Sequence, residues 1–286
     1  MKKRPIDVVV LSDIHLGTYG CRAKELLKYL KSINPNTVIL NGDIIDIWQF
    51  SKRYWPKSHM KVVKQFMTWI SKGVEVYYVT GNHDEMLRKF VGFELSAFSI
   101  VNKVMLDIDG KKAWIFHGDV FDVTMQHSKW IAKLGAVGYD SLILLNSAIN
   151  FFALKMGKGP ISMSKKIKNS VKSAVKFINN FEQTAADIAI ENNYDYVICG
   201  HIHQPEIRTI ENSHGSVMYL NSGDWIENLT ALEYNDKTWR LYSYEADETI
   251  QKESKKDAEQ EEEESQVLEN KELFQNLIKE FQSIKK

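Results

Sequence analysis

The chain has 286 residues, a length compatible with one large domain or two small ones. Lys and Arg total 37, as do Asp and Glu, so the net charge of zero gives no global field that favours nucleic acid as a partner. Two cysteines, Cys21 and Cys199, lack CxxC spacing and are expected to be reduced structural thiols. We expect neither a signal peptide nor a transmembrane helix, because no apolar stretch is both long enough and free of charge.

The first 120 residues alternate between strand and helix patterns. Strands are expected at 6–11, 38–40 and 74–79, where β-branched and apolar residues form short runs. Helices are expected at 23–33 and 62–70, where apolar residues recur at helical spacing. This order favours a largely parallel, buried sheet flanked by helices.

Strand patterns dominate the rest of the predicted core. A hairpin is expected at 104–108 and 112–116, on either side of the turn Asp109-Gly110. A strand is expected at 196–198, and three more at 216–220, 229–234 and 238–244.

Between these strands, residues from about 124 to 190 have a helical pattern, and no Asp or Glu occurs from 141 to 181. We interpret this segment as a helical cap inserted over the site, with core or dimer packing as the alternative. The expected domain therefore covers 1–246 and includes the cap. Residues 247–286 are expected to form an acidic linker and an amphipathic C-terminal helix.

Five polar motifs accompany the predicted strands: Asp13-Ile14-His15, Gly42-Asp43, Gly81-Asn82-His83-Asp84, His117-Gly118-Asp119 and Gly200-His201-Ile202-His203. The DxH and HxH spacings bring two side chains to one side only in extended backbone, because on a helix they would point about 200° apart. These pairs therefore belong at strand ends or in loops.

The motifs contain seven candidate metal ligands: Asp13, His15, Asp43, Asn82, His117, His201 and His203. Seven ligands are too many for one tetrahedral ion, and they fit two ions that share a carboxylate. Mixed oxygen and imidazole ligands suit Mn²⁺, which we expect first, or Zn²⁺ or iron, better than Mg²⁺ or Ca²⁺. A pair of such ions activates water and clamps the attacking and leaving oxygens of phosphoryl transfer.

In this order the motifs resemble the calcineurin-like metallophosphoesterase superfamily, over about residues 7–225. The resemblance implies an α/β fold, a four-layer αββα sandwich. It implies one metal held by Asp13, His15, Asp43 and His203, and another held by Asp43, Asn82, His117 and His201, with Asp43 bridging. It also implies that His83 protonates or stabilises the leaving oxygen and that Asp84 orients His83.

A narrower resemblance rests on the segment from Gly42-Asp43 to Trp48, on His117-Gly118-Asp119 and on the helical insert. These features are similar to UDP-2,3-diacylglucosamine hydrolases of lipid A synthesis, which release UMP and a lipid sugar phosphate. One position departs from that family, because His83 stands where well-known members often carry Arg. The resemblance implies a cytoplasmic enzyme on the inner face of the membrane, with an acyl groove from 142–156. Substrate or anionic lipid contacts are expected from Trp48, Lys165, Lys168 and Lys172.

Several alternatives remain open. The substrate is either this nucleotide-linked glycolipid or a soluble nucleotide or phosphoester, and a non-catalytic scaffold is disfavoured because no ligand is missing. The lysine-rich stretch could be an ordinary solvated surface. A substrate contact from Tyr54 or Trp55 is open, and His59 is interpreted as incidental. The segment 221–225 either shapes the site or forms a plain turn, and the oligomeric state is open.

Overall fold

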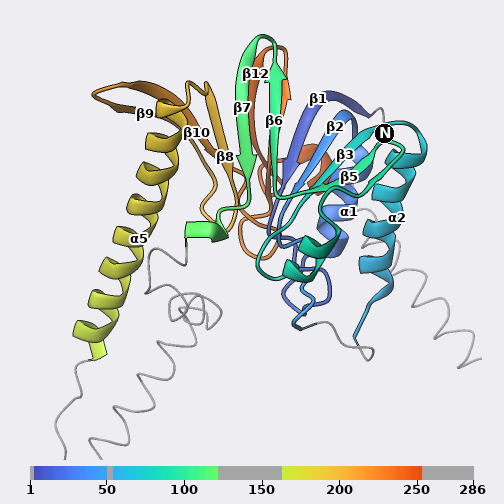
Figure 1. Cartoon of the computed structure of the whole chain (residues 1–286). Coiled ribbons are helices and arrows are strands. Elements are labelled where there is room, and N and C mark those ends of the chain that lie inside the picture. The colour runs from blue at the N-terminus through green and yellow to red at the C-terminus, as the bar shows by residue number, and fades with distance from the viewer. Residues whose placement is uncertain (1–2, 50–53, 122–162, 253–286) are drawn as a thin grey trace, which may run out of the picture. The chain divides into compact units, whose positions relative to one another are not determined.

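The computed structural model describes residues 3–49, 54–121 and 163–252, with the backbone alone over 163–175 (Figure 1). Its contacts separate two units, Met1–Tyr242 and Ser243–Lys286. Most of the expected cap and most of the expected C-terminal helix lie outside the described residues, so both remain predictions, as does a domain boundary after residue 246.

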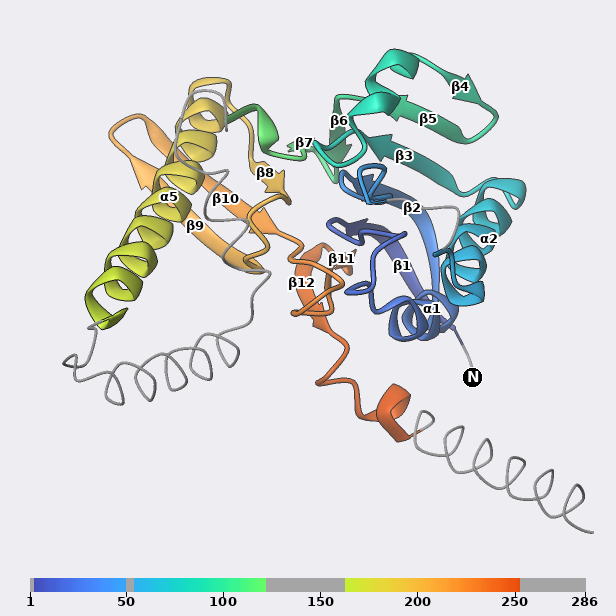
Figure 2. The same ribbon diagram turned by 90° about the horizontal axis from the view of Figure 1, so that it is seen from below.

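The larger sheet has seven strands in the order β12-β11-β1-β2-β3-β5-β4. Strands β1, β2, β3 and β5 run parallel, while β11 and β4 pair antiparallel with their neighbours. Helices α1 (Ala23–Ser32) and α2 (Lys57–Ser71) lie together beside this sheet (Figure 2). The strands are β1 (Arg4–Leu11), β2 (Ile33–Asn41), β3 (Glu75–Val79), β4 (Glu94–Leu95), β5 (Phe98–Val101), β11 (Thr230–Asn235) and β12 (Thr238–Ser243).

The smaller sheet has five strands in the order β6-β7-β8-β10-β9. Helix α5 (Met163–Glu191) packs on it (Figures 1 and 2). The helix buries Phe181 and a row of alanines against Val197 and Tyr219. The strands are β6 (Lys103–Ile108), β7 (Lys111–Phe116), β8 (Tyr196–Cys199), β9 (Glu206–Asn212) and β10 (Gly215–Asn221).

The two sheets share one apolar core. Val10 and Ile39 of the larger sheet belong to the same buried cluster as Ile115, Ile198 and Leu220 of the smaller one. Helices α1 and α2 flank the larger sheet and α5 packs on the smaller, so the layers are helix, sheet, sheet and helix. The expected α/β fold, a four-layer αββα sandwich, is confirmed.

Three strands were not expected from the sequence. Strand β9 carries mostly polar residues and lies at an edge of its sheet with several exposed positions, so it lacks the apolar alternation of a half-buried strand. Strands β4 and β5 have two and four residues, too few for a periodic pattern. The hairpin of β6 and β7 around Asp109-Gly110 is confirmed.

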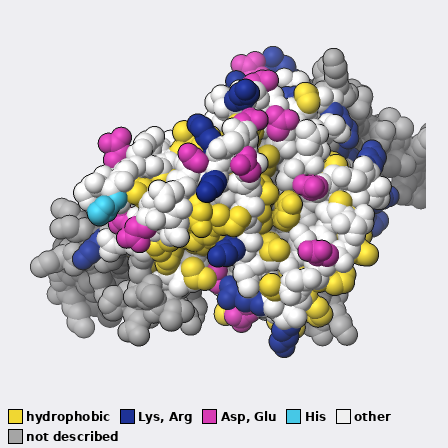
Figure 3. All heavy atoms as spheres, turned by 45° about the horizontal axis from the view of Figure 1, so that its top comes forward, with side chains coloured by type: hydrophobic (Ala, Val, Ile, Leu, Met, Phe, Trp, Pro, Cys, Tyr) yellow, Lys and Arg dark blue, Asp and Glu magenta, His cyan; other side chains and the backbone are white. Residues whose placement is uncertain are grey.

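Both cysteines are buried and free in the part of the chain that the structure describes, as predicted. Within the same part, we find no helix with the length and apolar character needed to cross a membrane. The surface in Figure 3 mixes acidic and basic side chains around a band of hydrophobic ones, so neither charge sign dominates that face.

Candidate metal centre

All five polar motifs lie at or just beyond the carboxyl ends of strands. Asp13 follows β1, Asp43 follows β2 and Asn82 follows β3, three parallel neighbours of the larger sheet. His117 and His201 follow β7 and β8, parallel neighbours of the smaller sheet. Carboxyl ends of parallel strands meet along one edge, so each sheet presents its polar side chains at that edge.

The loops are tied to one another by their backbones. The amide of Asp13 donates to the carbonyl of Gly42 at 3.1 Å, and that of His15 donates to Asp43 at 2.9 Å. In the smaller sheet the amide of Gly200 donates to the carbonyl of His117 at 2.9 Å. These bonds hold the ligand-bearing segments in fixed register before any ligand is bound.

Five of the candidate ligands have left-handed backbone conformations, which L residues with side chains seldom adopt. Their φ angles are 50° for Asp13, 53° for His15, 54° for Asp43, 68° for His201 and 53° for His203. Such conformations cost of order 1–3 kcal/mol each and persist where the surrounding structure imposes them. Their concentration here indicates a site held in shape at the expense of stability.

The side chains converge into three adjoining groups whose potential ligand atoms lie within 4.8 Å of one another. Asp43 belongs to two groups and joins residues from both sheets. Its Oδ2 lies 3.3 Å from His117 Nε2 and 4.0 Å from His15 Nε2, while Asp13 Oδ1 lies 3.2 Å from His203 Nε2. The groups are Asp13, His15 and His203; His15, Asp43 and His83; and Asp43, His117 and His201.

Four buried polar atoms in these motifs make no hydrogen bond to the part of the chain that the structure describes. They are Asp13 Oδ1, His15 Nε2, Asn82 Oδ1 and His117 Nε2. A buried polar atom left unpaired costs about 1–3 kcal/mol, so such atoms are rare and concentrate where a ligand completes them. Two carboxyl or amide oxygens and two imidazole nitrogens are the donor set that a transition-metal ion accepts.

Two glycines allow this close approach. A Cβ on Gly42 would lie 2.3 Å from the ring of His117, and a Cβ on Gly81 would lie 2.3 Å from Asp43 Oδ1. Gly42 also has a φ of +78°, in the left-handed region. Any side chain at either position would displace a candidate ligand.

The electrostatics of the groups favour charged carboxylates. Burial raises the pKa of Asp13, but the positive charge of His203, whose Nε2 lies close to Asp13 Oδ1, outweighs burial and lowers it to about 2. Burial likewise opposes ionisation of Asp43, and His117 and His15 overcome it and lower its pKa. Burial lowers the pKa of His203, but the negative charge of Asp13 raises it, and the net result is a rise to about 9. A cation bound among these groups would supply the positive charge that protonated imidazoles supply to the carboxylates here.

His117 is oriented for ligation through one nitrogen. Its Nδ1 lies 2.9 Å from the carbonyl oxygen of Asn41 and donates to it, since a carbonyl can only accept. The other nitrogen, Nε2, is the unpaired atom that points to Asp43. This arrangement fixes the tautomer in the way typical of metal-bound histidines.

The structure corrects the expected role of Asp84. Asp84 is fully buried and accepts hydrogen bonds from Ile44 N, Gly81 N and the hydroxyl of Tyr78, so it holds the loops together. Asp46 takes the place expected for Asp84, because its Oδ2 lies 3.0 Å from His83 Nδ1. Burial lowers the pKa of His83, but the hydrogen bond that His83 donates to Asp46 and the charge of Asp43 produce a net rise. Asp46 was visible only as a second carboxylate three residues after Asp43.

Two further supporting residues were missed. Asp224 is fully buried, accepts from the amides of Ile226 and Glu227, and lies 3.7 Å from His203 Nδ1, so segment 221–225 shapes the site. His59, interpreted as incidental, is 2% exposed and accepts a hydrogen bond at Nδ1 from Gly17 in the loop after His15. Both act through contacts between distant segments.

The expected substrate contacts are only partly described. Trp48 is 66% exposed, and its ring centre lies 5.8 Å from that of His83, beside the candidate centre. Lys165, Lys168 and Lys172 belong to the start of α5, where side chains lie outside the described residues. Arg88 forms an ion pair with Asp119 and so links the segments that follow His83 and His117.

Comparison with known proteins decides the family. A family model described as calcineurin-like phosphoesterase matches residues 6–205. The chain belongs to this family. Calcineurin-like phosphoesterases work with divalent metal ions, and the three groups of ligand-type side chains suit such ions. The chain is therefore a metal-dependent phosphoesterase.

Two curated relatives carry the same name. A UDP-2,3-diacylglucosamine hydrolase from Aliivibrio fischeri is 23% identical over 83% of this chain and 98% of its own length. One from Blochmanniella pennsylvanica is 25% identical over 81% and 93%. A solved archaeal phosphodiesterase aligns with 82% of this chain and 98% of its own, at a TM-score of 0.41 and 15% identity.

Proposed function

We propose that this phosphoesterase hydrolyses the phosphoanhydride bond of UDP-2,3-diacylglucosamine. The products are UMP and 2,3-diacylglucosamine 1-phosphate. The observation that carries the hydrolytic part is the set of four buried, unpaired ligand-type atoms where both sheets converge. The substrate is supported by the names of the relatives, which are 21–25% identical to this chain over most of its length.

The seven ligands would hold two ions around a shared Asp43. Asp13, His15, Asp43 and His203 form one set, and Asp43, Asn82, His117 and His201 form the other. The mixed donor set favours Mn²⁺ first, with Zn²⁺ or iron as alternatives. When bound, such ions lower the pKa of water and neutralise charge on the phosphate oxygens.

The residues of the chain supply position and a proton. His83 is held through Nδ1 by Asp46, which leaves Nε2 to stabilise or protonate the bridging oxygen as it leaves. The oxygen of water forms the new bond to phosphorus while the bond to the bridging oxygen breaks. Trp48, exposed beside His83, would contact the substrate next to the reacting phosphates.

The test of the substrate is release of UMP from UDP-2,3-diacylglucosamine by protein loaded with Mn²⁺. We expect turnover that disappears with a chelator and returns when Mn²⁺ is added. Protein that binds metal and cleaves a simple phosphodiester, but releases no UMP from this lipid, would sink the substrate assignment and leave the hydrolase intact.

A soluble nucleotide or phosphoester is the second candidate substrate. It is favoured by His83, which stands where well-known diacylglucosamine hydrolases often carry Arg. Faster cleavage of cyclic nucleotides or phosphomonoesters than of the lipid, unchanged on deleting 141–160, would establish it.

The same proposal includes attachment to an anionic membrane surface. Its support is the sequence, in which Lys165, Lys168 and Lys172 occur in a stretch without acidic residues. Binding to vesicles that contain anionic lipid should fall as salt rises, because salt screens such attraction. Binding that ignores salt, or none at all, would contradict this part.

A further inference from the structure

Tyr19 is the most exposed large side chain among the apolar and aromatic residues that the structure describes, at 82%. Its ring lies over that of Tyr54, with centres 3.7 Å apart and planes tilted by 35°. One face of the Tyr19 ring is therefore covered and the remainder is open to solvent. An aromatic ring held open in this way is a ready surface for a second planar group.

This exposed ring belongs to the loop that carries a metal ligand. Tyr19 follows His15, and the backbone between them could span at most about 14 Å if fully extended. The span is shortened by a turn, because the amide and hydroxyl of Thr18 both donate to the carbonyl of His15, at 3.2 and 2.9 Å. A bridge between Leu16 and Ile45 ties this loop to the one after Asp43.

The stacked pair rests on a buried support. His59, which is 2% exposed, contacts Tyr54 edge-on, with 5.9 Å between the ring centres. The Nδ1 of His59 accepts a hydrogen bond from the amide of Gly17, so the same residue also holds the loop that carries Tyr19. A ring fixed before binding loses little conformational freedom when a ligand stacks on it.

We propose that the Tyr19–Tyr54 pair is a platform on which the nucleobase of the substrate stacks. The phosphates of the same nucleotide then reach the loops of His15 and Asp43. A base has a flat π-face that adds to the two rings as a third layer, which suits it better than the puckered ring of a sugar. The inference rests on the proposed function only in requiring a nucleotide, and it gives the base a site separate from the phosphates.

The test uses calorimetry on the full chain loaded with Mn²⁺. It compares the binding of two probes, UMP and ribose 5-phosphate. Stacking contributes roughly 5- to 150-fold in affinity per base. We expect Tyr19→Ala and Tyr19→Leu to weaken UMP by about that factor and to leave ribose 5-phosphate unchanged. Tyr19→Phe should keep the wild-type preference for UMP. Met105→Ala, which removes a 45% exposed side chain from β6, is the matched control and should change neither affinity.

Three results would overturn the platform: equal binding of UMP and ribose 5-phosphate by the wild type, UMP affinity unchanged in Tyr19→Ala, or equal losses for both probes. Thermal unfolding of each variant checks that the exposed position leaves the fold intact. Failure of the proposed substrate is separable, because a protein that shows the ring-dependent UMP preference but does not cleave UDP-2,3-diacylglucosamine keeps the platform. Cleavage of that lipid without the preference would keep the substrate and remove the platform.

Discussion

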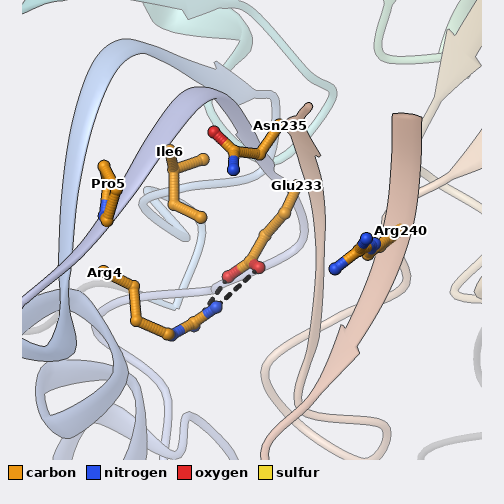
Figure 4. A pocket seen from close by; sticks show the side chains of 6 residues that line it. All are labelled: Arg4, Pro5, Ile6, Glu233, Asn235 and Arg240. Atoms are coloured by element: carbon orange, nitrogen blue, oxygen red, sulfur yellow. Dashed lines mark hydrogen bonds and ion pairs between the residues drawn. The ribbon is translucent and has the colours of Figure 1, made fainter. Parts of the chain in front are cut away.

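The two ends of strand β1 carry polar clusters of opposite character. At the amino end, Arg4 donates twice to the carboxylate of Glu233, at 2.9 Å each (Figure 4). The hydroxyl of Tyr29 donates to the same carboxylate. A cavity of about 220 Å³ adjoins this cluster. At the carboxyl end, Asp13 and His15 each carry a buried polar atom that has no hydrogen-bond partner in the described chain.

This difference separates a structural network from a site. The amino-end cluster satisfies its buried members with one another, so it needs nothing further to be stable. The carboxyl-end cluster keeps like charges close, strained backbone and unpaired atoms, which the fold tolerates only if something else completes them. Variants at the two ends should therefore affect different quantities.

The largest effect is expected at Asp43, which joins both sets of ligands. Asp43→Asn should lower kcat roughly 10⁴-fold or more, because a group on which a whole catalytic unit depends is not compensated by the others. The measurement is steady-state hydrolysis of a phosphodiester with excess Mn²⁺. Activity within tenfold of the wild type would mean that the carboxyl-end cluster is structural after all.

The next effect concerns His83 and its partner. We expect His83→Ala to lower kcat by about 10²- to 10⁴-fold, the usual share of general acid–base catalysis. Asp46→Asn should cost about 10- to 100-fold, since it disturbs only the orientation of His83. The kcat of the double variant should be no lower than that of His83→Ala. If the double variant instead loses the product of the two single effects, Asp46 does not act through His83.

A smaller effect, on stability alone, is expected at the opposite end of β1. Glu233→Ala leaves the buried hydroxyl of Tyr29 unpaired and should lower the free energy of unfolding by about 2 kcal/mol. Glu233→Gln keeps an acceptor and should recover part of that loss. Urea unfolding measures both. A change in kcat of more than twofold at saturating metal would contradict a purely structural role for the amino-end cluster.

The smallest effect is a pH dependence at His59. Burial lowers the pKa of His59 below its ordinary 6.5. The unfolded chain therefore takes up a proton there more readily, so this residue lowers folding stability as pH falls below about 6.5. In His59→Gln the loss of unfolding free energy between pH 7.5 and 5.5 should be smaller than in the wild type. An equal or larger loss would show that His59 is not held neutral.

The sequence supports the fold class and the convergence of the motifs because both follow from local patterns. Apolar runs mark β1, β2 and β3, and the ligands come directly after them, so parallel strands bring them together. The site residues that the sequence patterns do not reveal are brought into place by tertiary contacts. Asp46 reaches His83 only because the loops after β2 and β3 meet, and nothing in the spacing of the two residues signals it.

The same reason explains the other omissions. His59 supports the Gly17 loop from the start of α2, and Asp224 approaches His203 from the loop after β10. Edge strand β9 is polar because one side of it has no neighbouring strand to pack against. Local pattern finds the groups that do the chemistry, whereas the groups that hold them in place depend on packing.

The most direct test of the account is the stoichiometry and affinity of Mn²⁺ binding to the purified chain, measured by calorimetry with elemental analysis of the same sample. We expect two ions per chain in the wild type. Asp43→Asn should weaken both together, and Glu233→Ala should change neither. A single ion, none, or two ions retained unchanged by Asp43→Asn would contradict a centre in which one carboxylate joins the two sheets.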